Sequence, residues 1–216
     1  MVAAPAIEVQ EAAIRPAYSS DAEAMARLIE IAGAGIPSYL WSTMAEPGET
    51  PLDVGIKRAL RESGSFSYTN GLMATVNGKV VGMILAYPLN APTPSDLASL
   101  GDIPPLFRPF IELEYEAPGS FYINALAVFL GWRDRGLGSL LLEAAEDRAR
   151  QLGCRTISVQ AFSQNPGAVR LYQRHGFKLV DERPLFPHPC YPYDESTVLL
   201  VRDLPEQRVS ARSPRP

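Results

Sequence analysis

Residues 133–139 combine two arginines with two closely spaced glycines, in the order Arg-Asp-Arg-Gly-Leu-Gly-Ser. A short apolar run at 121–130 precedes them and predicts a buried strand. After them, leucines and alanines recur every three or four residues from Leu137 to Ala149, which predicts a core-packed helix. A strand that enters a helix through glycines directs unpaired backbone N–H groups and the positive end of the helix dipole toward one point. With two arginines beside it, this turn predicts a binding site for a phosphate group.

The spacing of the glycines excludes two common nucleotide-binding patterns. A dinucleotide fingerprint needs a third glycine three residues after the second, where this chain has Leu141. A P-loop needs lysine and then serine or threonine after its second glycine; Gly131 and Gly136 have that separation, but the pair Leu-Gly follows them. The pattern that fits is Arg-x-x-Gly-x-Gly, which begins at Arg133.

A second patterned segment lies further along the chain, at residues 165–177. Asn165 followed by Pro166 predicts a helix start, because asparagine caps a first turn and proline fits the first helical position. The segment has the pattern Asn-x-x-Ala-x-x-Leu-Tyr-x-x-x-Gly-Phe and leads into another predicted strand. Together with the earlier glycine turn, it resembles the two cofactor segments of the GNAT N-acetyltransferase superfamily.

The resemblance implies a fold and a co-substrate. The fold class would be α/β, a mixed sheet with antiparallel N-terminal strands, a splayed pair of parallel strands at the cofactor site, and flanking helices. The co-substrate would be acetyl-CoA, its pantetheine arm lying in the gap between the splayed strands along backbone groups of Leu126, Ala127 and Val128. Its pyrophosphate would bind at the glycine turn. The further cofactor-binding residues that the resemblance implies are Arg133, Arg135, Gly136, Leu137, Gly138, Ser139, Asn165 and Tyr172.

Acetyl transfer to an amine needs a proton acceptor for the amine, a stabilised oxyanion and a proton donor for the leaving thiolate. Under the resemblance, Tyr172 is the candidate general acid, because a phenol with a pKa of about 10 can protonate a thiolate whose basicity is near that of cysteine, pKa ~8.5. Some relatives carry a glutamate near the start of the cofactor strand, where this chain has Tyr122. Glu112 and Glu114 lie just upstream and are the candidate bases, directly or through water. The histidines and cysteines lack metal-ligand spacing, so we expect no metal.

The elements that would position these residues follow an α/β order. Ser20 and Glu23 predict a capping box at the start of an N-terminal helix that ends at Gly33. Thr50, followed by proline, predicts the start of another helix. An Asn-Gly pair at 77–78, between two apolar runs, predicts a type I′ hairpin. We therefore expect antiparallel strands before the cofactor strand.

Residues 88–120 form a proline-rich insertion between the hairpin and the cofactor strand. Segments this long without regular structure inside a compact domain are typically functional or disordered. The part at 106–115 mixes aromatic and acidic residues. Two interpretations stay open: a lid or wall on the acceptor side, or a packing insertion that does not contact the substrate.

Length and composition bound the remaining expectations. A chain of 216 residues is long enough for one domain, which we assign to 1–204, and the Arg-, Ser- and Pro-rich residues 205–216 are expected to be a disordered tail. A net charge of −4 and a pI of 5.3 argue against nucleic acid as a partner. Two cysteines are no disulfide framework, no apolar run could span a bilayer, and the N-terminus lacks the basic region of a signal peptide. We therefore expect a cytoplasmic protein without a membrane partner.

The predicted function is that of an acyltransferase, an acetyl-CoA-dependent N-acetyltransferase that moves an acetyl group to a primary amine by direct attack on the thioester. The acceptor, a small-molecule amine or a protein amine, stays open, and so does assembly as a homodimer. A non-catalytic acyl-CoA-binding or sensor module of the same fold is the alternative from another class. A nucleotide-binding module that prefers ATP or NAD is a further alternative.

Overall fold

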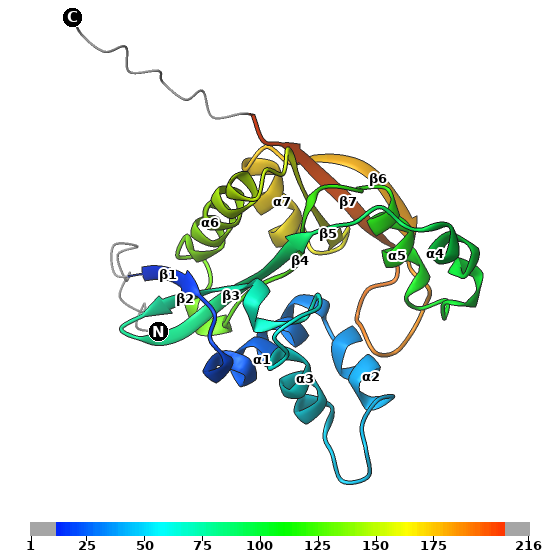
Figure 1. Cartoon of the computed structure of the whole chain (residues 1–216), viewed down its shortest axis with the longest axis horizontal. Helices are drawn as coiled ribbons and strands as arrows, with labels where there is room; N and C mark the ends of the chain where they lie inside the picture. Colours follow the sequence, from blue (N-terminus) through cyan, green and yellow to red (C-terminus); the bar gives the residue numbers. More distant parts are fainter. Residues whose placement is uncertain (1–11, 206–216) are drawn as a thin grey trace, which may run out of the picture.

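A seven-stranded mixed sheet forms the centre of the computed structural model, which describes residues 12–205 (Figure 1). The strands are β1 (Ala12–Pro16), β2 (Gly71–Val76), β3 (Lys79–Pro88), β4 (Phe121–Val128), β5 (Thr156–Phe162), β6 (Lys178–Pro184) and β7 (Ser196–Asp203). They lie in the order β1-β2-β3-β4-β5-β7-β6, and β4 and β5 are the parallel pair. The tail expected beyond Pro205 and the N-terminal residues examined for a signal peptide lie outside the described residues.

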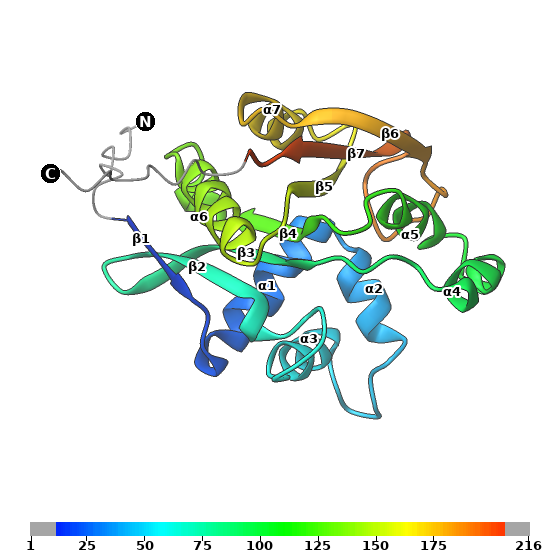
Figure 2. The ribbon, with the colours of Figure 1, turned by 45° about the horizontal axis from the view of Figure 1, so that its top comes forward.

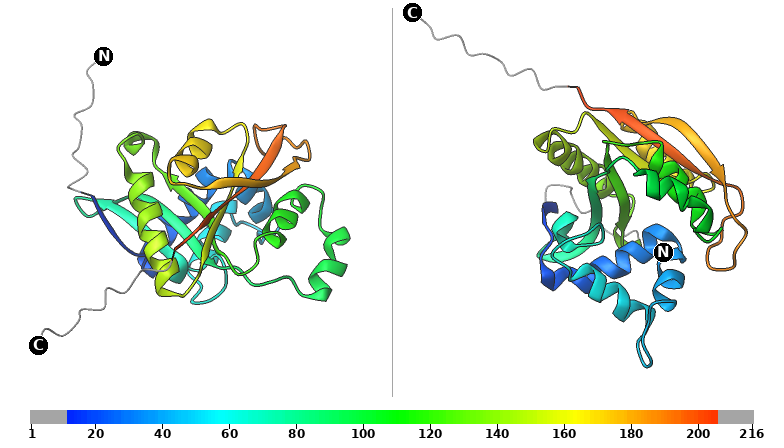
Figure 3. Two further views of the ribbon diagram at one scale, coloured as in Figure 1. Left: turned by 90° about the horizontal axis from the view of Figure 1, so that it is seen from above. Right: turned by 45° about the vertical axis from the view of Figure 1, so that its right-hand side comes forward.

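Helices cover both faces of the sheet, as Figures 2 and 3 show. The helices are α1 (Ala22–Gly33), α2 (Ile36–Ser42), α3 (Pro51–Ala59), α4 (Pro94–Ala98), α5 (Arg108–Tyr115), α6 (Leu137–Gln151) and α7 (Pro166–Arg174). On one face, α6 and α7 pack on a core that includes Leu200 of β7. On the other, α1 and α3 cover the N-terminal strands, while Leu113 of α5 packs on Leu199 of β7. The alternation of Leu199 and Leu200 is the two-residue period of a strand buried on both sides.

Several local predictions are confirmed by the backbone. Asn77 and Gly78 both have positive φ, 50° and 76°, as a type I′ turn requires. Thr50 caps α3, accepting a hydrogen bond from the Asp53 N–H while the Asp53 carboxylate accepts one from the Thr50 N–H. β-Strands β1, β2 and β3 form the expected antiparallel meander before β4.

The capping box predicted from Ser20 and Glu23 is wrong. A short 3₁₀ turn occupies Ser19–Asp21, and α1 begins after it, at Ala22. The acid that organises this start is Asp21, whose carboxylate accepts a hydrogen bond from the Tyr18 N–H at 2.8 Å and pairs with Arg15 at 2.7 Å. Arg15 at the end of β1 therefore selects a different carboxylate from the one that local spacing suggested.

An extra residue in β4 separates it from its parallel neighbour. Leu85 of β3 pairs with Ala125, but the next residue, Ala86, pairs with Ile123, so Asn124 is left over as a β-bulge. The pairing of β4 with β5 stops at Ile123, although β4 continues to Val128. The predicted splayed strand pair is therefore confirmed.

The joint between α1 and α2 touches the segment that connects β6 to β7. Gly35 has a φ of 108°, and an added Cβ would lie 1.8 Å from the carbonyl oxygen of Cys190. The ring of Tyr39 on α2 also meets His188 of the same segment edge-on, with centroids 4.6 Å apart. Residues 185–195, distant in sequence, are thus held against α2.

Replacing Gly35 with alanine should destabilise the protein more than the same change at Gly64. Both residues have left-handed φ values, which cost an alanine about 1 kcal/mol, but only the Gly35 Cβ meets backbone atoms within 4 Å. The clash should add about 1–3 kcal/mol to the loss of unfolding free energy, measured by urea denaturation. Equal losses for the two variants would contradict the contact between α2 and residues 185–195.

Candidate active site

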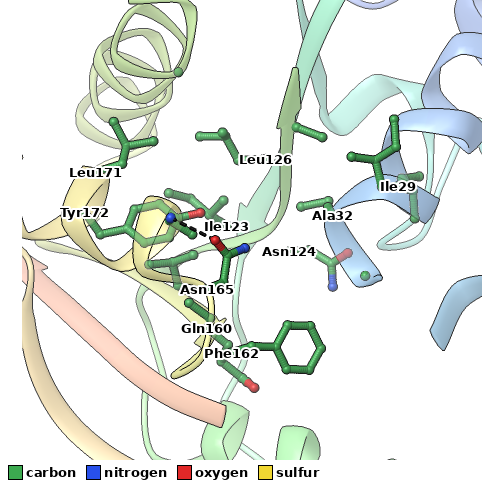
Figure 4. Close-up of a pocket in the computed structure, with 18 of the residues that line it drawn as sticks. Ile29, Ala32, Ile123, Asn124, Leu126, Gln160, Phe162, Asn165, Leu171 and Tyr172 are labelled. Carbon is green, nitrogen blue, oxygen red and sulfur yellow. Dashed lines mark hydrogen bonds between the residues drawn. The ribbon is translucent and has the colours of Figure 1, made fainter. Parts of the chain in front are cut away.

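A cavity of about 710 Å³ opens between the splayed strands and extends from α6 to α1 and α2 (Figure 4). Figure 4 shows Gln160, Asn165 and Tyr172 on one side of it and Ile29 and Ala32 of α1 on the other. The residues predicted for the site that line it are Glu114, Leu126, Ala127, Val128, Arg133, Gly136, Leu137, Gly138, Ser139, Asn165 and Tyr172. The structure thus brings most of them together, while Glu112 and Arg135 are not in the lining.

The backbone of β4 beyond the bulge has one edge turned toward the gap. The N–H of Phe129 bonds to the Val81 oxygen of the neighbouring segment at 2.9 Å, and alternation along the strand turns Ala127 the same way. Leu126 and Val128 therefore direct their N–H and C=O groups away from β3, toward β5. Since β5 pairs with β4 only as far as Ile123, these groups face the cavity.

The glycine turn has the unpaired N–H groups that its sequence predicted. Gly136 caps α6 in a left-handed conformation, with φ 78°. Ser139 already donates its N–H to the Gly136 oxygen at 3.0 Å. Leu137 and Gly138, in contrast, donate to no residue within 12–205. Both line the cavity at the positive end of a fifteen-residue helix, so this is where an anion fits.

Side chains around the turn are held by other contacts. Arg133 donates from Nε to the Val128 oxygen at 3.1 Å, which ties the turn to the end of β4. Arg135 lies over the Trp132 ring, 5.2 Å from its centroid. The Ser139 hydroxyl is 3.0 Å from Nε2 of His175 at the end of α7. This contact links the two patterned segments.

Gly138 allows helices α6 and α7 to approach each other. A Cβ at this position would lie 3.0 Å from Cδ2 of Leu171 on α7. A larger residue would push Leu171, which also lines the cavity, and so would change the space between α6 and α7. The glycine therefore serves helix packing as well as the open turn.

The second patterned segment contributes a cap and a buried phenol. Asn165 accepts a hydrogen bond from the Ala168 N–H at 3.2 Å, as an N-cap residue does. Tyr172 is 4% exposed, lines the cavity, and packs its ring on Phe177 with centroids 5.6 Å apart. Burial raises the pKa of its hydroxyl well above the ordinary value, so the phenol stays protonated.

The two candidate bases lie in different surroundings. Glu114 is half-buried and lines the cavity, and burial raises the pKa of its carboxyl group to about 7 against a smaller, opposing hydrogen bond with Tyr122. Glu112 points elsewhere and pairs with Arg183 of β6 at 3.2 Å. The cavity-facing residues of this segment follow a helical spacing: Phe107, Phe110, Ile111 and Glu114.

Two tyrosines that line the cavity were not among the candidate site residues of the sequence analysis. Tyr87 and Tyr122 are cross-strand partners on β3 and β4, with rings edge-on and centroids 5.9 Å apart. Burial raises the pKa of Tyr87, and the polar side chains of Ser65 and Asn124 nearby oppose that shift. Burial raises the pKa of Tyr122, and the neighbouring carboxylate of Glu114 adds to the shift; Tyr172 lies close enough to interact with it as well. Tyr122 is thus a near neighbour of both the candidate base and the candidate acid.

The family of the chain is shown by comparison with known proteins. The profile of the acetyltransferase (GNAT) family matches residues 37–177, and the chain belongs to this family. The uncharacterized N-acetyltransferase YdgE of Bacillus subtilis is 32% identical over 62 residues, which are 29% of this chain and 40% of that relative. The chain thus aligns with less than half the length of this curated relative.

Solved structures share the fold. A Drosophila melanogaster polyamine N-acetyltransferase, described as catalysing the formation of N-acetylagmatine, superposes with a TM-score of 0.63 at 19% identity, over 89% of this chain and 100% of that one. The putative acetyltransferase yncA of Salmonella typhimurium, solved with its cofactor acetyl-CoA, has a TM-score of 0.59 at 16% identity, over 94% of this chain and 99% of that one. At these identities the likeness concerns the fold.

Residues 12–205 contain neither a membrane-spanning helix nor a cluster of metal ligands. Between residues 12 and 205, none of the helices combines the length and the apolar character that a bilayer crossing needs. In the same range, no three His, Cys, Asp or Glu side chains are grouped as metal ligands.

Glu114→Gln should stabilise the protein at pH 8 relative to wild type and do less at pH 5. The folded protein keeps the Glu114 proton up to about pH 7, whereas an unfolded glutamate loses it near the ordinary pKa of 4.5. As the pH rises from 4.5 through 7, the wild type therefore loses stability that the glutamine variant keeps. The measurement is unfolding free energy at both pH values, with Glu112→Gln as the matched control. The same effect of Glu114→Gln at both pH values would contradict the raised pKa.

Proposed function

We propose that this chain is an acetyl-CoA-dependent N-acetyltransferase in which a primary amine attacks the thioester directly. The observation that carries the proposal is a single cavity that joins an anion-binding turn to a half-buried carboxyl group and a buried tyrosine. Membership of the acetyltransferase family supports acetyl-CoA as the acetyl donor.

The residues present fit this co-substrate. Free N–H groups of Leu137 and Gly138 suit the pyrophosphate, with the Arg133 guanidinium nearby. The edge of β4 at Leu126 and Val128, which has no partner strand among residues 12–205, suits the amide groups of pantetheine, which would bond to it as an added strand does. Arg135 and Ser139 flank the turn and can contact the outer phosphates, while Asn165 holds the start of α7.

Glu114 supplies the proton acceptor. A carboxyl group with a pKa of about 7 is ionised in half of the molecules at neutral pH and is more basic than an exposed glutamate. It removes a proton from the acceptor ammonium, directly or through a water molecule, so that the amine nitrogen has a free electron pair. Glu112 is the weaker candidate because it lies outside the cavity and is engaged by Arg183.

Strand β4 stabilises the oxyanion, and helix α7 provides the proton donor for the leaving thiolate. A backbone N–H of β4, at Leu126 or Val128, donates to the thioester oxygen as it becomes negative. When the C–S bond breaks, the sulfur keeps its electron pair and Tyr172 gives it a proton. The high pKa of the buried phenol keeps that proton in place at neutral pH.

We propose further that residues 1–204 form one domain and that the protein is cytoplasmic. The continuous sheet from β1 to β7 supports the first proposal. Cys154 and Cys190 are both free thiols, which supports a reducing compartment.

The test is release of CoA thiol by the purified protein with acetyl-CoA and a panel of primary amines. We expect kcat/KM to rise with pH up to about pH 7, as Glu114 loses its proton, and then to level off. Glu114→Gln should lower it by roughly 10²–10⁴-fold and remove this rise, because the variant has no base.

Glu112→Gln is the matched control, because Glu112 lies on the same helix as Glu114 and only Leu113 separates them. If it causes the loss instead, the roles of the two glutamates are exchanged. Calorimetric titration with acetyl-CoA, ATP and NAD completes the test. Binding of acetyl-CoA without any thiol release favours a non-catalytic sensor, and preference for ATP or NAD would falsify acetyl-CoA as the co-substrate.

Tyr172→Phe should lower kcat by roughly 10²–10⁴-fold while changing the dissociation constant of acetyl-CoA only slightly. The ring and its packing on Phe177 remain, and only the proton donor is lost. Tyr68→Phe, in the core under α1 and α3, removes a tyrosine hydroxyl outside the cavity and is the control. Weakened binding with unchanged kcat would remove Tyr172 as the general acid.

A further inference from the structure

The charged side chains of the cavity are unevenly distributed. Among its described lining residues, four carry a carboxylate or a guanidinium group: Glu114, Arg133, Asp134 and Arg174. Three of these belong to the cofactor end, in the glycine turn and on α7. Glu114 is therefore the one charged group on the acceptor side of the described lining.

The rest of the described acceptor side carries no charge and, apart from polar groups that include those of Ser65, Tyr87, Tyr122, Asn124 and Gln160, is apolar and aromatic. Its wall is formed by α1 and α2, by the cavity face of α5, and by the end of β5; the side chains include Ile29, Ile36, Trp41, Phe107, Phe110 and Phe162. Figure 4 shows the Phe162 ring at the acceptor end, below Asn165. A charge placed against such a wall loses its hydration and gains no partner.

One polar atom in this wall has no partner within the described chain. Gln160 donates from Nε2 to the Phe110 oxygen at 2.9 Å, but its buried Oε1 accepts no hydrogen bond from residues 12–205. Phe110 and Glu114 are four residues apart on α5, so the Gln160 amide is anchored one helical turn before Glu114. The Glu114 carboxylate suits a hydrogen-bond donor such as an ammonium group and does not suit a carboxylate of the substrate.

Residues 185–195, between β6 and β7, pack against Phe162 of this wall. Tyr191 stacks on Phe162 with centroids 5.9 Å apart, and Tyr39 on α2 meets His188 at 4.6 Å. Gly35 and Cys190 touch through their backbones. These contacts hold residues 185–195 against α2 and against the Phe162 ring of the wall.

Resting on the proposed acetyl transfer, we infer that the acceptor is a small monoamine: one ammonium group on an aliphatic or aromatic body, without a second cation or a carboxylate. Glu114 receives the ammonium group, and the aromatic wall receives the body. A dication would leave its second charge against Phe107, Phe110 or Phe162. A free amino acid would bring a carboxylate beside Glu114, where no cation of the described wall meets it.

The first experiment compares matched amines with the wild-type protein and acetyl-CoA. Phenethylamine is the monoamine, phenylalanine adds a carboxylate to the same body, agmatine carries a second cation, and a short peptide with N-terminal phenylalanine represents polypeptides. We expect kcat/KM for phenethylamine to exceed each of the others by ~100-fold or more, the discrimination expected for an unpaired charge in an apolar site. Agmatine, phenylalanine or the peptide within tenfold of phenethylamine overturns the inference and leaves the proposed function standing. Acetyl-CoA binding without acetylation of any amine overturns both.

A second experiment changes the number of carboxylates in the wall. Ile111 lines the cavity one helical turn before Glu114, so Ile111→Glu adds a second carboxylate for a dication. We expect the ratio of kcat/KM for agmatine to that for phenethylamine to rise by ~10-fold or more over Ile111→Gln, the uncharged variant of matched size. Circular dichroism and thermal unfolding of both variants establish that they are folded. Equal ratios in the two folded variants show that charge at this wall does not select the acceptor, and the inference then fails.

Discussion

The bulge at Asn124 is the constraint on which the cavity depends. One extra residue in β4 ends its pairing with β5 at Ile123 and leaves the edge of Leu126 and Val128 without a partner strand. Unpaired backbone groups inside a protein carry a free-energy cost, so a sheet opens in this way only where something else satisfies them. The helices keep the gap open: α6 and α7 meet where Gly138 approaches Leu171, and α1 packs on the other face of β4. The turn and the tyrosine that the chemistry needs are therefore fixed on opposite sides of one opening.

Short sequence patterns predicted much of the fold that positions the cavity. The Asn77-Gly78 turn, the cap at Thr50 and the strand–turn–helix at 121–151 each depend on neighbours a few residues away, and all are confirmed. The capping box at Ser20 failed because Arg15, at the end of β1, attracts Asp21 into the turn. Strand β7 inserts between β5 and β6, an order that no local pattern of the chain expresses. The cross-strand pair of Tyr87 and Tyr122 likewise depends on the register of β3 against β4.

The choice between Glu112 and Glu114 depends on helix α5, which the sequence analysis did not predict. With residues 106–115 described only as a mixed segment, both acids were equal candidates. As a helix, α5 turns by about 100° per residue, so two residues two positions apart point in nearly opposite directions. Leu113 is buried against Leu199, Glu114 faces the cavity, and Glu112 meets Arg183 on the outer side. The insertion therefore both packs on the sheet and forms part of the cavity wall, and the two interpretations of residues 88–120 each describe one face of α5.

The basicity and the acceptor selectivity that we propose for this site have the same physical origin. The wall that removes water from Glu114 raises the pKa of its carboxyl group to about 7, which makes it a better proton acceptor than an exposed glutamate. The same removal of water penalises any further charge that a substrate brings to the wall. A more polar wall that accepted dications would hydrate Glu114, lower its pKa and weaken it as a base. In this fold, a carboxyl group tuned by burial and an acceptor with a single charge therefore belong together, and a dication would require a second carboxylate rather than a wetter wall.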